Sequence, residues 1–319
     1  KVKFYKQALS ILDDTKELIT TEDYINELRK GGMSLKDEEE FKAKNGSWKS
    51  SIVQKIDMIL KSGEVDGISN NNELIAIENL TKIAGIGPSN ASKLYKEHNI
   101  TTVEDLREVY KLNRKILNEK QSIGLIHYDD LNKRIPREEM NMWKEIMEDI
   151  FKDTLKELSI DEYKFELSGS YRRGKQDSGD VDVLISTDTH GDIILDKYYN
   201  NLIKNKIIIN QNLISKGQTK IMAVAKIDEF FRHLDIFYYP KEVFPFSLLF
   251  TTGSKEFNVL MRSYANKKGY TLNEKNLTKL NGQLVSENEY ISKIGKNIPE
   301  IEKDIFLFLD FKYVDPINR

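Results

Sequence analysis

Apolar residues recur three or four positions apart through the first half of the chain, which is the spacing of one face of an α-helix. The predicted helices are 4–14, 21–30, 51–63, 72–83, 91–98, 102–111 and 138–158. Gly63 is expected to end the third of them as a C-cap. The polar run 69–73 is typical of a loop, so we expect a domain boundary there.

The second half of the chain changes to a strand pattern. Its apolar segments are short and rich in β-branched and aromatic residues, which favours β-strands. The predicted strands are 163–170, 180–186, 206–214, 220–227 and 233–240. A smaller region that mixes helix and strand is expected from residue 241 onward.

Composition narrows the possible functions only in part. The chain has 319 residues, enough for two or three domains, and its formal net charge of −2 excludes a uniformly basic nucleic-acid binder. The absence of Cys excludes disulfides and cysteine zinc sites. No apolar run is long enough to cross a bilayer and no secretory signal is visible at the start, so no membrane partner is expected. The acidic run 37–40 is interpreted as a solvated face.

The stretch GDVDV places two carboxylates one residue apart inside an apolar run. On a strand, Asp180 and Asp182 would share one face, about 7 Å apart, and would repel each other without a cation. Asp235, in the apolar segment HLDIF, would complete a three-carboxylate cradle for two Mg²⁺ ions, the arrangement used in phosphoryl transfer. The alternative is an exposed edge strand with ordinary surface acids.

The residues just before this pair favour the metal interpretation. The segment GSYRRG offers backbone N–H groups, the Ser170 hydroxyl and the guanidinium groups of Arg172 and Arg173. Such groups beside metal-binding acids are typical of a triphosphate cradle. The glycines in the segment permit tight turns and a close approach of the backbone to a ligand.

Taken together, GSYRRGKQDSGDVDV and the downstream HLDIF resemble the palm signature of the nucleotidyltransferase superfamily, and specifically of the family X DNA polymerases, closest to the beta-type members. The resemblance extends over nearly the whole chain. It includes AGIGPSNASKLYKEHNITTVEDLR, IGLIHYDDLNKRIPREEM and LLFTTGSKEFNVLMRSYANKKGYTLNE. By this comparison the chain opens on what corresponds to the second helix of the family's amino-terminal domain.

The resemblance implies an α+β multidomain fold with four parts. These are a helical 5′-deoxyribose phosphate lyase-like domain (1–69), a helix-hairpin-helix DNA-binding subdomain (70–136), a catalytic palm β-sheet (137–240) and a small α+β nucleotide-selecting subdomain (241–319).

The resemblance also assigns roles in the polymerase site. Asp180 and Asp182 would bind both Mg²⁺ ions, for which Mn²⁺ can substitute, and Asp235 would bind the catalytic ion near the primer 3′-hydroxyl. The implied deoxynucleoside triphosphate (dNTP) ligands are Ser170, Arg173, Ser178, Gly179, Arg134, Phe250, Gly253 and Asn258. Arg262 would reach the DNA template. For Arg134, a salt bridge with Glu138 is an equally open interpretation.

This chain departs from the family pattern at several of these positions. Phe250 stands where the beta-type members have tyrosine, and Lys255 replaces an acidic residue near the incoming base. His233 and Phe237 replace two arginines that flank the third aspartate. Loss of these charges is expected to alter how Asp235 is held.

Two further sites are implied in the amino-terminal half. In the second hairpin, Gly85 and Gly87 would approach a DNA phosphate. The backbone carbonyls of Thr81, Ile83 and Ile86 would hold Na⁺ or K⁺. A plain packing role for this helix pair is the alternative.

In the lyase-like domain, Lys55 matches the lysine that forms a Schiff base, and Lys1 and Tyr5 match DNA-contacting positions beside it. An exposed helix residue is the alternative interpretation of Lys55. The first hairpin reads GSW instead of GVG, although Trp48 and Lys49 are expected to contact a DNA end.

The expected function is a template-directed, gap-filling DNA polymerase with a 5′-deoxyribose phosphate lyase activity in base excision repair. Its partners would be gapped or nicked double-stranded DNA and a dNTP, and the protein would act as a monomer. Nuclear localisation follows from family analogy, with a cytoplasmic or viral setting left open. Two alternatives remain at this point: an untemplated terminal or RNA-tailing nucleotidyltransferase, and a non-catalytic scaffold that binds DNA ends.

Overall fold

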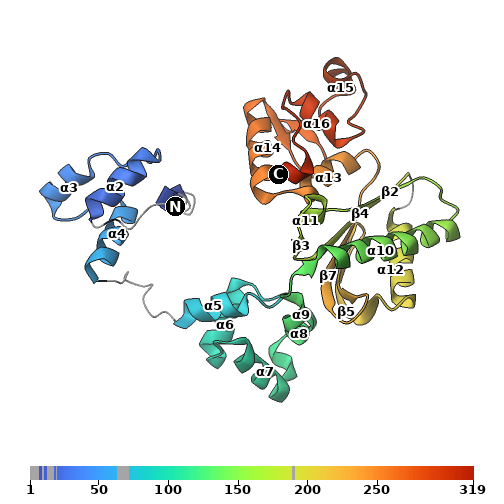
Figure 1. The fold of residues 1–319 in the computed structure, drawn as a ribbon, viewed down its shortest axis with the longest axis horizontal. Helices are drawn as coiled ribbons and strands as arrows, with labels where there is room; N and C mark the ends of the chain where they lie inside the picture. Colours follow the sequence, from blue (N-terminus) through green and yellow to red (C-terminus); the bar gives the residue numbers. More distant parts are fainter. Residues whose placement is uncertain (1–6, 9–10, 13–17, 19, 63–71, 189–190) are drawn as a thin grey trace. The chain divides into compact units, whose positions relative to one another are not determined.

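The computed structural model describes residues 7–8, 11–12, 18, 20–62, 72–188 and 191–319 (Figure 1). The chain divides into two compact units. Unit 1 contains residues 1–78 and 92–101, and unit 2 contains 79–91 and 102–319. None of the helices that the structure describes is both long and apolar enough to span a membrane.

Unit 1 is helical in all of its described elements. Its helices are α2 (Thr21–Lys30), α3 (Glu38–Asn45) and α4 (Ser51–Ser62), together with most of α5 (Asn72–Leu80) and α6 (Pro88–His98). Helix α2 starts at a capping box in which Thr20 and Asp23 satisfy each other's backbone amides. The apolar faces of α2 and α4 meet in a small core around Ile25, Leu28 and Val53.

Two expectations for unit 1 need correction at single residues. Three residues of the acidic run 37–40 are exposed as predicted, but Glu38, the first residue of α3, is only 2% exposed. The Glu38 carboxylate accepts the backbone amides of Lys49 and Ser50, which fixes the turn before α4. Trp48, expected at a DNA end, is also 2% exposed and belongs to the core of this unit.

Unit 2 begins with short helices and continues into a five-stranded sheet. Its first helices are α7 (Val103–Leu112), η1 (Arg114–Ile116), α8 (Glu119–Ile126), α9 (Tyr128–Leu131) and the long α10 (Arg137–Glu157). The strands of the sheet are β2 (Tyr163–Leu167), β4 (Val181–Thr187), β5 (Ile208–Lys216), β6 (Lys220–Lys226) and β7 (Phe231–Tyr238). All five correspond to predicted strands, so these predictions are confirmed.

The sheet has the order β2-β4-β7-β6-β5, and β4 and β7 are parallel neighbours. Alternate residues of β4 and β7, such as Val181, Val183 and Ile236, are fully buried against α10 and α12 (Gly191–Lys204). The residues between them face the opposite side of the sheet. This alternation directs the acidic side chains of the two strands away from the core.

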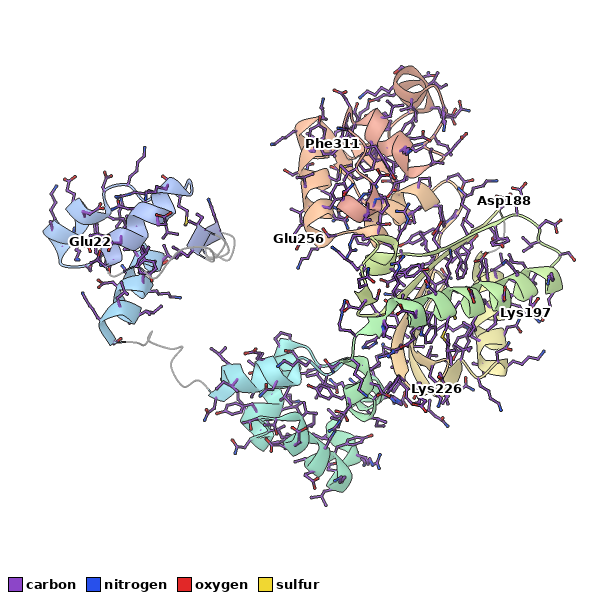
Figure 2. All side chains as sticks on the ribbon, viewed as in Figure 1. Glu22, Asp188, Lys197, Lys226, Glu256 and Phe311 are labelled. Atoms are coloured by element: carbon purple, nitrogen blue, oxygen red, sulfur yellow. The ribbon has the colours of Figure 1, made fainter. Side chains whose placement is uncertain are left out.

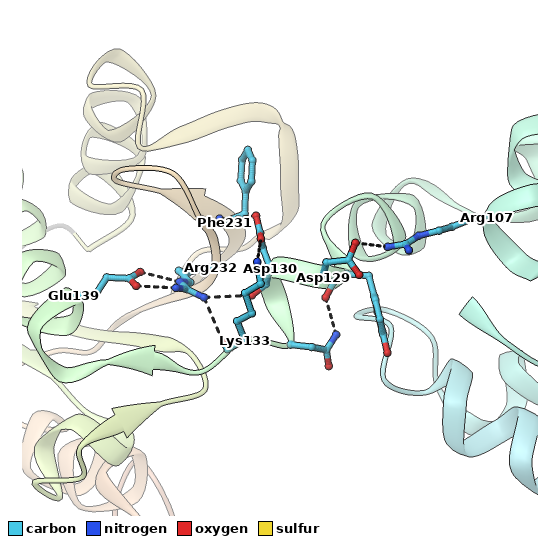
Figure 3. A network of polar contacts seen from close by, with 9 residues as sticks. Arg107, Asp129, Asp130, Lys133, Glu139, Phe231 and Arg232 are labelled. Atoms are coloured by element: carbon cyan, nitrogen blue, oxygen red, sulfur yellow. Dashed lines mark hydrogen bonds and ion pairs between the residues drawn. The ribbon is translucent and has the colours of Figure 1, made fainter. Parts of the chain in front are cut away.

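A network of polar contacts joins α9 and α10 to β7 (Figure 3). Arg232, 3% exposed, donates two hydrogen bonds to the Glu139 carboxylate at 2.7 and 2.8 Å. Its remaining nitrogen donates to the carbonyls of Asp130 and Lys133. The Asp130 carboxylate in turn accepts the Phe231 amide at 3.2 Å. These contacts fix the start of β7 at Phe231, two residues before HLDIF begins.

The last part of unit 2 is a small layer of helices with a hairpin. It contains α13 (Phe244–Thr252), α14 (Lys255–Lys267), β8 (Tyr270–Leu272), β9 (Leu277–Lys279), α15 (Glu287–Ile294), α16 (Glu302–Phe308) and η2 (Pro316–Asn318). Aromatic residues form its core, and Phe311 packs against them (Figure 2).

Short elements complete the unit: α11 (Gly169–Arg172), and the strands β1 (Ile135–Pro136) and β3 (Asp177–Ser178), which pair with each other. The predicted α+β multidomain class is confirmed.

Candidate active site

Two of the three aspartates lie directly side by side on neighbouring strands. Asp182 on β4 is the register partner of Asp235 on β7, and Asp180 lies one residue before β4 begins. Burial and the nearby Asp180 and Asp235 carboxylates raise the pKa of Asp182 to about 8. Burial and Asp235 also raise the pKa of Asp180. The site therefore concentrates negative charge that a cation would stabilise.

The turn that contains α11, before β3, lies close to the Asp182 carboxylate. Gly169 has φ +59°, and a Cβ atom there would lie 2.8 Å from the Asp182 carboxylate. A side chain at this position would both strain the backbone and press on Asp182. Glycine is therefore required by the approach of the turn to the carboxylate.

A cavity of about 640 Å³ opens between this turn and helices α13 and α14. It is lined by Arg134, Gly169, Ser170, Arg173, Gly179, Asp180, Asp182, Phe250, Thr251, Gly253, Lys255, Asn258, Val259 and Arg262. The structure thus brings together most of the residues that the sequence suggested for nucleotide and template binding. Val259 was missed, because on α14 it looks like any exposed apolar residue of an amphipathic helix.

Ser178 and Asp235 are not part of the cavity lining. Ser178 is 1% exposed, and the Ser170 hydroxyl donates to its oxygen at 2.9 Å. Ser178 is therefore buried next to the cavity wall and contacts the lining residue Ser170. Asp235 is on the neighbouring strand β7, where Lys220 Nζ is 2.8 Å from its carboxylate.

Adjacent arginines of the α11 turn have different surroundings. Arg172 donates to the Thr252 hydroxyl at 2.7 Å and to the Glu302 carboxylate, away from the cavity. Arg173 lines the cavity and donates through Nη1 to the Thr252 carbonyl. Its buried Nε has no hydrogen-bond partner among the described residues. Arg173 is thus the one of the two that is placed to meet an anion.

Arg134 pairs with Asp177 and not with Glu138. Its Nη2 lies 2.7 Å from Asp177 Oδ1, and the two side chains are 58% and 50% exposed. The proposed Glu138 salt bridge is therefore wrong. An exposed pair of this kind is weak, so it leaves Arg134 able to exchange Asp177 for a phosphate.

Residues of α13 and α14 form the other wall of the cavity. Phe250 is 40% exposed, and the guanidinium of Arg262 lies 5.2 Å from its ring centroid. Asn258 Nδ2 donates to the Phe250 carbonyl at 2.8 Å. Gly253 leaves room for Arg173, because a Cβ there would be 3.1 Å from Arg173 Nη1.

The acids suit hard divalent cations, but they are not preassembled. No three His, Cys, Asp or Glu side chains are grouped closely enough to hold an ion, within the part of the chain that the structure describes. Carboxylates without a counter-ion repel each other, and Asp235 is instead drawn to Lys220. The oxygen donors and the surplus negative charge fit Mg²⁺ or Mn²⁺. The metal roles of the three aspartates stay a prediction.

Family models match three consecutive parts of the chain. They are described as the fingers domain of DNA polymerase lambda (residues 78–132), the DNA polymerase beta palm (134–241) and the DNA polymerase beta thumb (247–319). The chain belongs to family X of the DNA polymerases. The cavity described above lies between the parts that match the palm and the thumb of this family.

Curated family X relatives cover most of this chain. DNA polymerase lambda of Arabidopsis thaliana is 25% identical over 99% of the chain and 57% of that relative. DNA polymerase lambda of Rattus norvegicus is 30% identical over 84% of the chain and 46% of its own length. The human DNA-directed DNA/RNA polymerase mu is 25% identical over 86% and 58%. The chain thus spans about half the length of the curated relatives it matches.

The turn between α5 and α6 contains the glycines that the sequence suggested for a DNA-binding hairpin. Gly85 has φ +84°, and a Cβ there would lie 3.3 Å from the backbone of Lys120 and Gln121. Gly124 on α8 was missed, although a Cβ there would lie 2.0 Å from the Ala84 carbonyl oxygen. The glycines therefore let this turn pack tightly on α8.

The predicted cation site in this hairpin is untested. The Ile83 carbonyl accepts the Ile86 amide at 3.0 Å, which leaves one lone pair of that oxygen for an ion. The roles of the Thr81 and Ile86 carbonyls, and of Gly87, stay predictions.

The predicted lyase residues are only partly described. Lys55 is half-buried on α4, two residues before Asp57. The Asp57 carboxylate accepts the Thr21 hydroxyl at 3.0 Å and pairs with Lys61 at 2.7 Å. Lys1 and Tyr5 lie outside the described residues. The lyase role of Lys55 stays a prediction.

Proposed function

We propose that the chain is a template-directed DNA polymerase that fills short gaps in double-stranded DNA during repair, with a dNTP as its second substrate. The observation that carries this proposal is the cavity of about 640 Å³ that is lined by Asp180, Asp182 and Arg173 together. The match of this region to the family X palm and thumb supports it.

The binding residues would hold the nucleotide from two sides. Arg173 and Arg134, which line the cavity, would bind the triphosphate oxygens as charge-assisted donors. The backbone at Gly253 would lie against the sugar, and Asn258 and Arg262 would face the base pair and the template. Closure of the thumb region over the base pair would complete the enclosure.

The reaction joins the primer 3′-oxygen to the α-phosphorus and breaks the α–β phosphoanhydride bond, so that pyrophosphate leaves. Divalent ions held by Asp180, Asp182 and Asp235 would supply charge neutralisation at the phosphates and the 3′-oxygen. Asp235 would accept the proton of the 3′-hydroxyl, as a carboxylate within hydrogen-bond reach can do. The remaining contribution of the chain is positioning.

The test is primer extension on a one-nucleotide gap with each dNTP in turn. We expect incorporation of the complementary nucleotide, its loss in Asp182→Asn, and unchanged binding of the gapped DNA by fluorescence anisotropy. Asp188→Asn is the matched control, because Asp188 lies just beyond the other end of β4 and pairs with Lys241. Extension by Asp182→Asn at the wild-type rate would refute the site assignment.

Ribonucleotide use is a second candidate that one observation favours. A relative is named a DNA-directed DNA/RNA polymerase, and Phe250 in the cavity lacks the tyrosine hydroxyl expected there. The same assay with ribonucleoside triphosphates, and with a primer that has no template, distinguishes templated deoxynucleotide transfer from ribonucleotide addition and from untemplated tailing.

We further propose a 5′-deoxyribose phosphate lyase activity through the Lys55 amine. The sequence resemblance at Lys55, which is half-buried on α4, supports this role. Borohydride should trap a covalent adduct with incised abasic DNA, and Lys55→Ala should abolish it. Lys61→Ala, on the same helix and 68% exposed, is the control and should keep the adduct. Equal trapping by both variants would exclude Lys55.

A further inference from the structure

Lys220 contacts the third aspartate of the candidate metal site. It is the first residue of β6 and the register partner of Phe237 on β7, so it lies diagonally across from Asp235 on the same face of the sheet. Its Nζ is 2.8 Å from Asp235 Oδ2 and 4.4 Å from the Phe237 ring centroid. The Lys220 ammonium therefore has an ionic and an aromatic partner side by side.

Other positive groups near the aspartates are engaged elsewhere. Arg134 pairs with Asp177, and Arg173 donates to the Thr252 carbonyl. Within the described residues, Lys220 is the one cationic side chain that forms an ion pair with any of the three aspartates.

The pair places a positive charge beside acids that would otherwise repel one another. Asp235 and Asp182 are register partners, so their side chains leave the sheet on the same face. A cation at Asp235 reduces the repulsion between these two carboxylates. Lys220 thus occupies the position at which a bound ion would act on Asp235.

We propose that Lys220 is a positioning residue that holds Asp235 until a divalent ion displaces it. The proposal rests on the proposed polymerase function. An incoming ion would take Asp235 Oδ2, and the ammonium would stay against the Phe237 ring, which offers a second site for a cation. Asp235 would then join the other two acids only when an ion competes successfully with Lys220. An ion delivered together with a triphosphate competes better than a free ion, because the nucleotide supplies further oxygen ligands.

The experiment measures Mn²⁺ binding in the absence of DNA and nucleotide, by electron paramagnetic resonance of the free ion. Lys220→Met keeps the length of the side chain and its contact with Phe237 but removes the charge. We expect Lys220→Met to bind Mn²⁺ about fivefold more tightly than wild type, the upper range for ion pairs at this exposure. Lys220→Arg keeps the charge and should bind like wild type.

Lys226 provides a matched control at the other end of β6 (Figure 2). Its Nζ lies 5.2 Å from the ring centroid of Phe231, its own register partner, but no ion pair is found for it among the described residues. Lys226→Met should leave the Mn²⁺ affinity unchanged. Asp235→Asn combined with Lys220→Met should bind Mn²⁺ no more tightly than Asp235→Asn alone, since the lysine acts through that carboxylate.

Unchanged or weaker Mn²⁺ binding by Lys220→Met would overturn the proposal. If that result came with weaker DNA binding and a smaller salt dependence, Lys220 would instead be a phosphate contact. Either outcome leaves the polymerase proposal intact, because that proposal fails only if gap filling is absent or survives Asp182→Asn. Thermal unfolding of each variant in chelator confirms that a changed Mn²⁺ affinity does not reflect a changed fold.

Discussion

The carboxylate of Glu302 is shared by two arginines in the interior of unit 2. Arg172 donates to it at 3.2 and 3.3 Å, Arg319 donates from the opposite side, and the Tyr313 hydroxyl adds a bond at 3.4 Å. Glu302 is 5% exposed and the Arg319 side chain 0%. Glu302→Gln keeps the shape but leaves two guanidinium groups without a counter-charge, so we expect a loss of about 3 kcal/mol in the free energy of unfolding.

Urea unfolding followed by tryptophan fluorescence can measure this loss. The chain has two tryptophans, Trp48 in the core of unit 1 and Trp143 in the core of unit 2, so Trp48→Phe makes the signal specific for unit 2. With a urea slope of about 3 kcal/mol per molar, the midpoint should fall by about 1 M. Glu162→Gln removes an exposed pair with Lys241 and should change stability by less than about 1 kcal/mol. A Glu302→Gln midpoint equal to that of the control would refute the reasoning.

Two further predictions concern backbone crowding and pH. Gly169→Ala should lower Mn²⁺ affinity and gap filling because its Cβ meets the Asp182 carboxylate, whereas Gly282→Ala, also at positive φ but with no atom within 4 Å, should cost only about 1 kcal/mol of stability. Equal Mn²⁺ affinity in the two variants would contradict this. Burial lowers the pKa of His127, which contacts Asn212, so the unfolded state binds the proton more readily and stability should fall as pH drops below about 6.5. His127→Gln should reduce the difference between urea midpoints at pH 7.5 and 5.5, and an unchanged difference would show that other groups cause it.

The strands of the sheet could be predicted because their signal is local. Residues such as Val181 and Val183 alternate with polar ones, and each strand is buried on the face that the alternation indicates. The acidic pair could be found for the same reason, since Asp180 and Asp182 are the polar residues that alternate with Val181 and Val183. The apolar segment around Asp235 made it a candidate third acid, but its register with Asp182 could not be predicted, because no local pattern shows which strands are neighbours.

Features that depend on distant contacts were not predictable. Glu38 looks like part of a solvated acidic run, yet it accepts the amides of Lys49 and Ser50, eleven and twelve residues away. The sequence around Trp48 does not indicate that its ring is buried in the core of unit 1. The sequence alone does not show that glycine is needed at position 124 of a helix. The need appears only when the structure places the Ala84 carbonyl against it.

The partner of Arg134 shows how a small element decides a contact. Glu138 lies four residues away on the sequence and is the natural expectation for an ion pair. The two-stranded sheet of β1 and β3 pairs Pro136 with Asp177, which carries that acid to Arg134 from 43 residues away. The register of β1 and β3, and not distance along the sequence, therefore decides that Asp177 is the ion-pair partner of Arg134, a candidate nucleotide-binding residue.

The two walls of the cavity are joined by hydrogen bonds to Thr252. The turn that carries Arg173 also carries Arg172, and both arginines bond to Thr252, the residue just before Gly253. Any shift of the thumb wall at Thr252 must therefore move Arg173 relative to the aspartates. Glu302 holds Arg172 in this arrangement from outside the cavity. A residue that never touches the nucleotide can thus set the distance between the triphosphate donors and the acids, which is the distance on which the proposed chemistry depends.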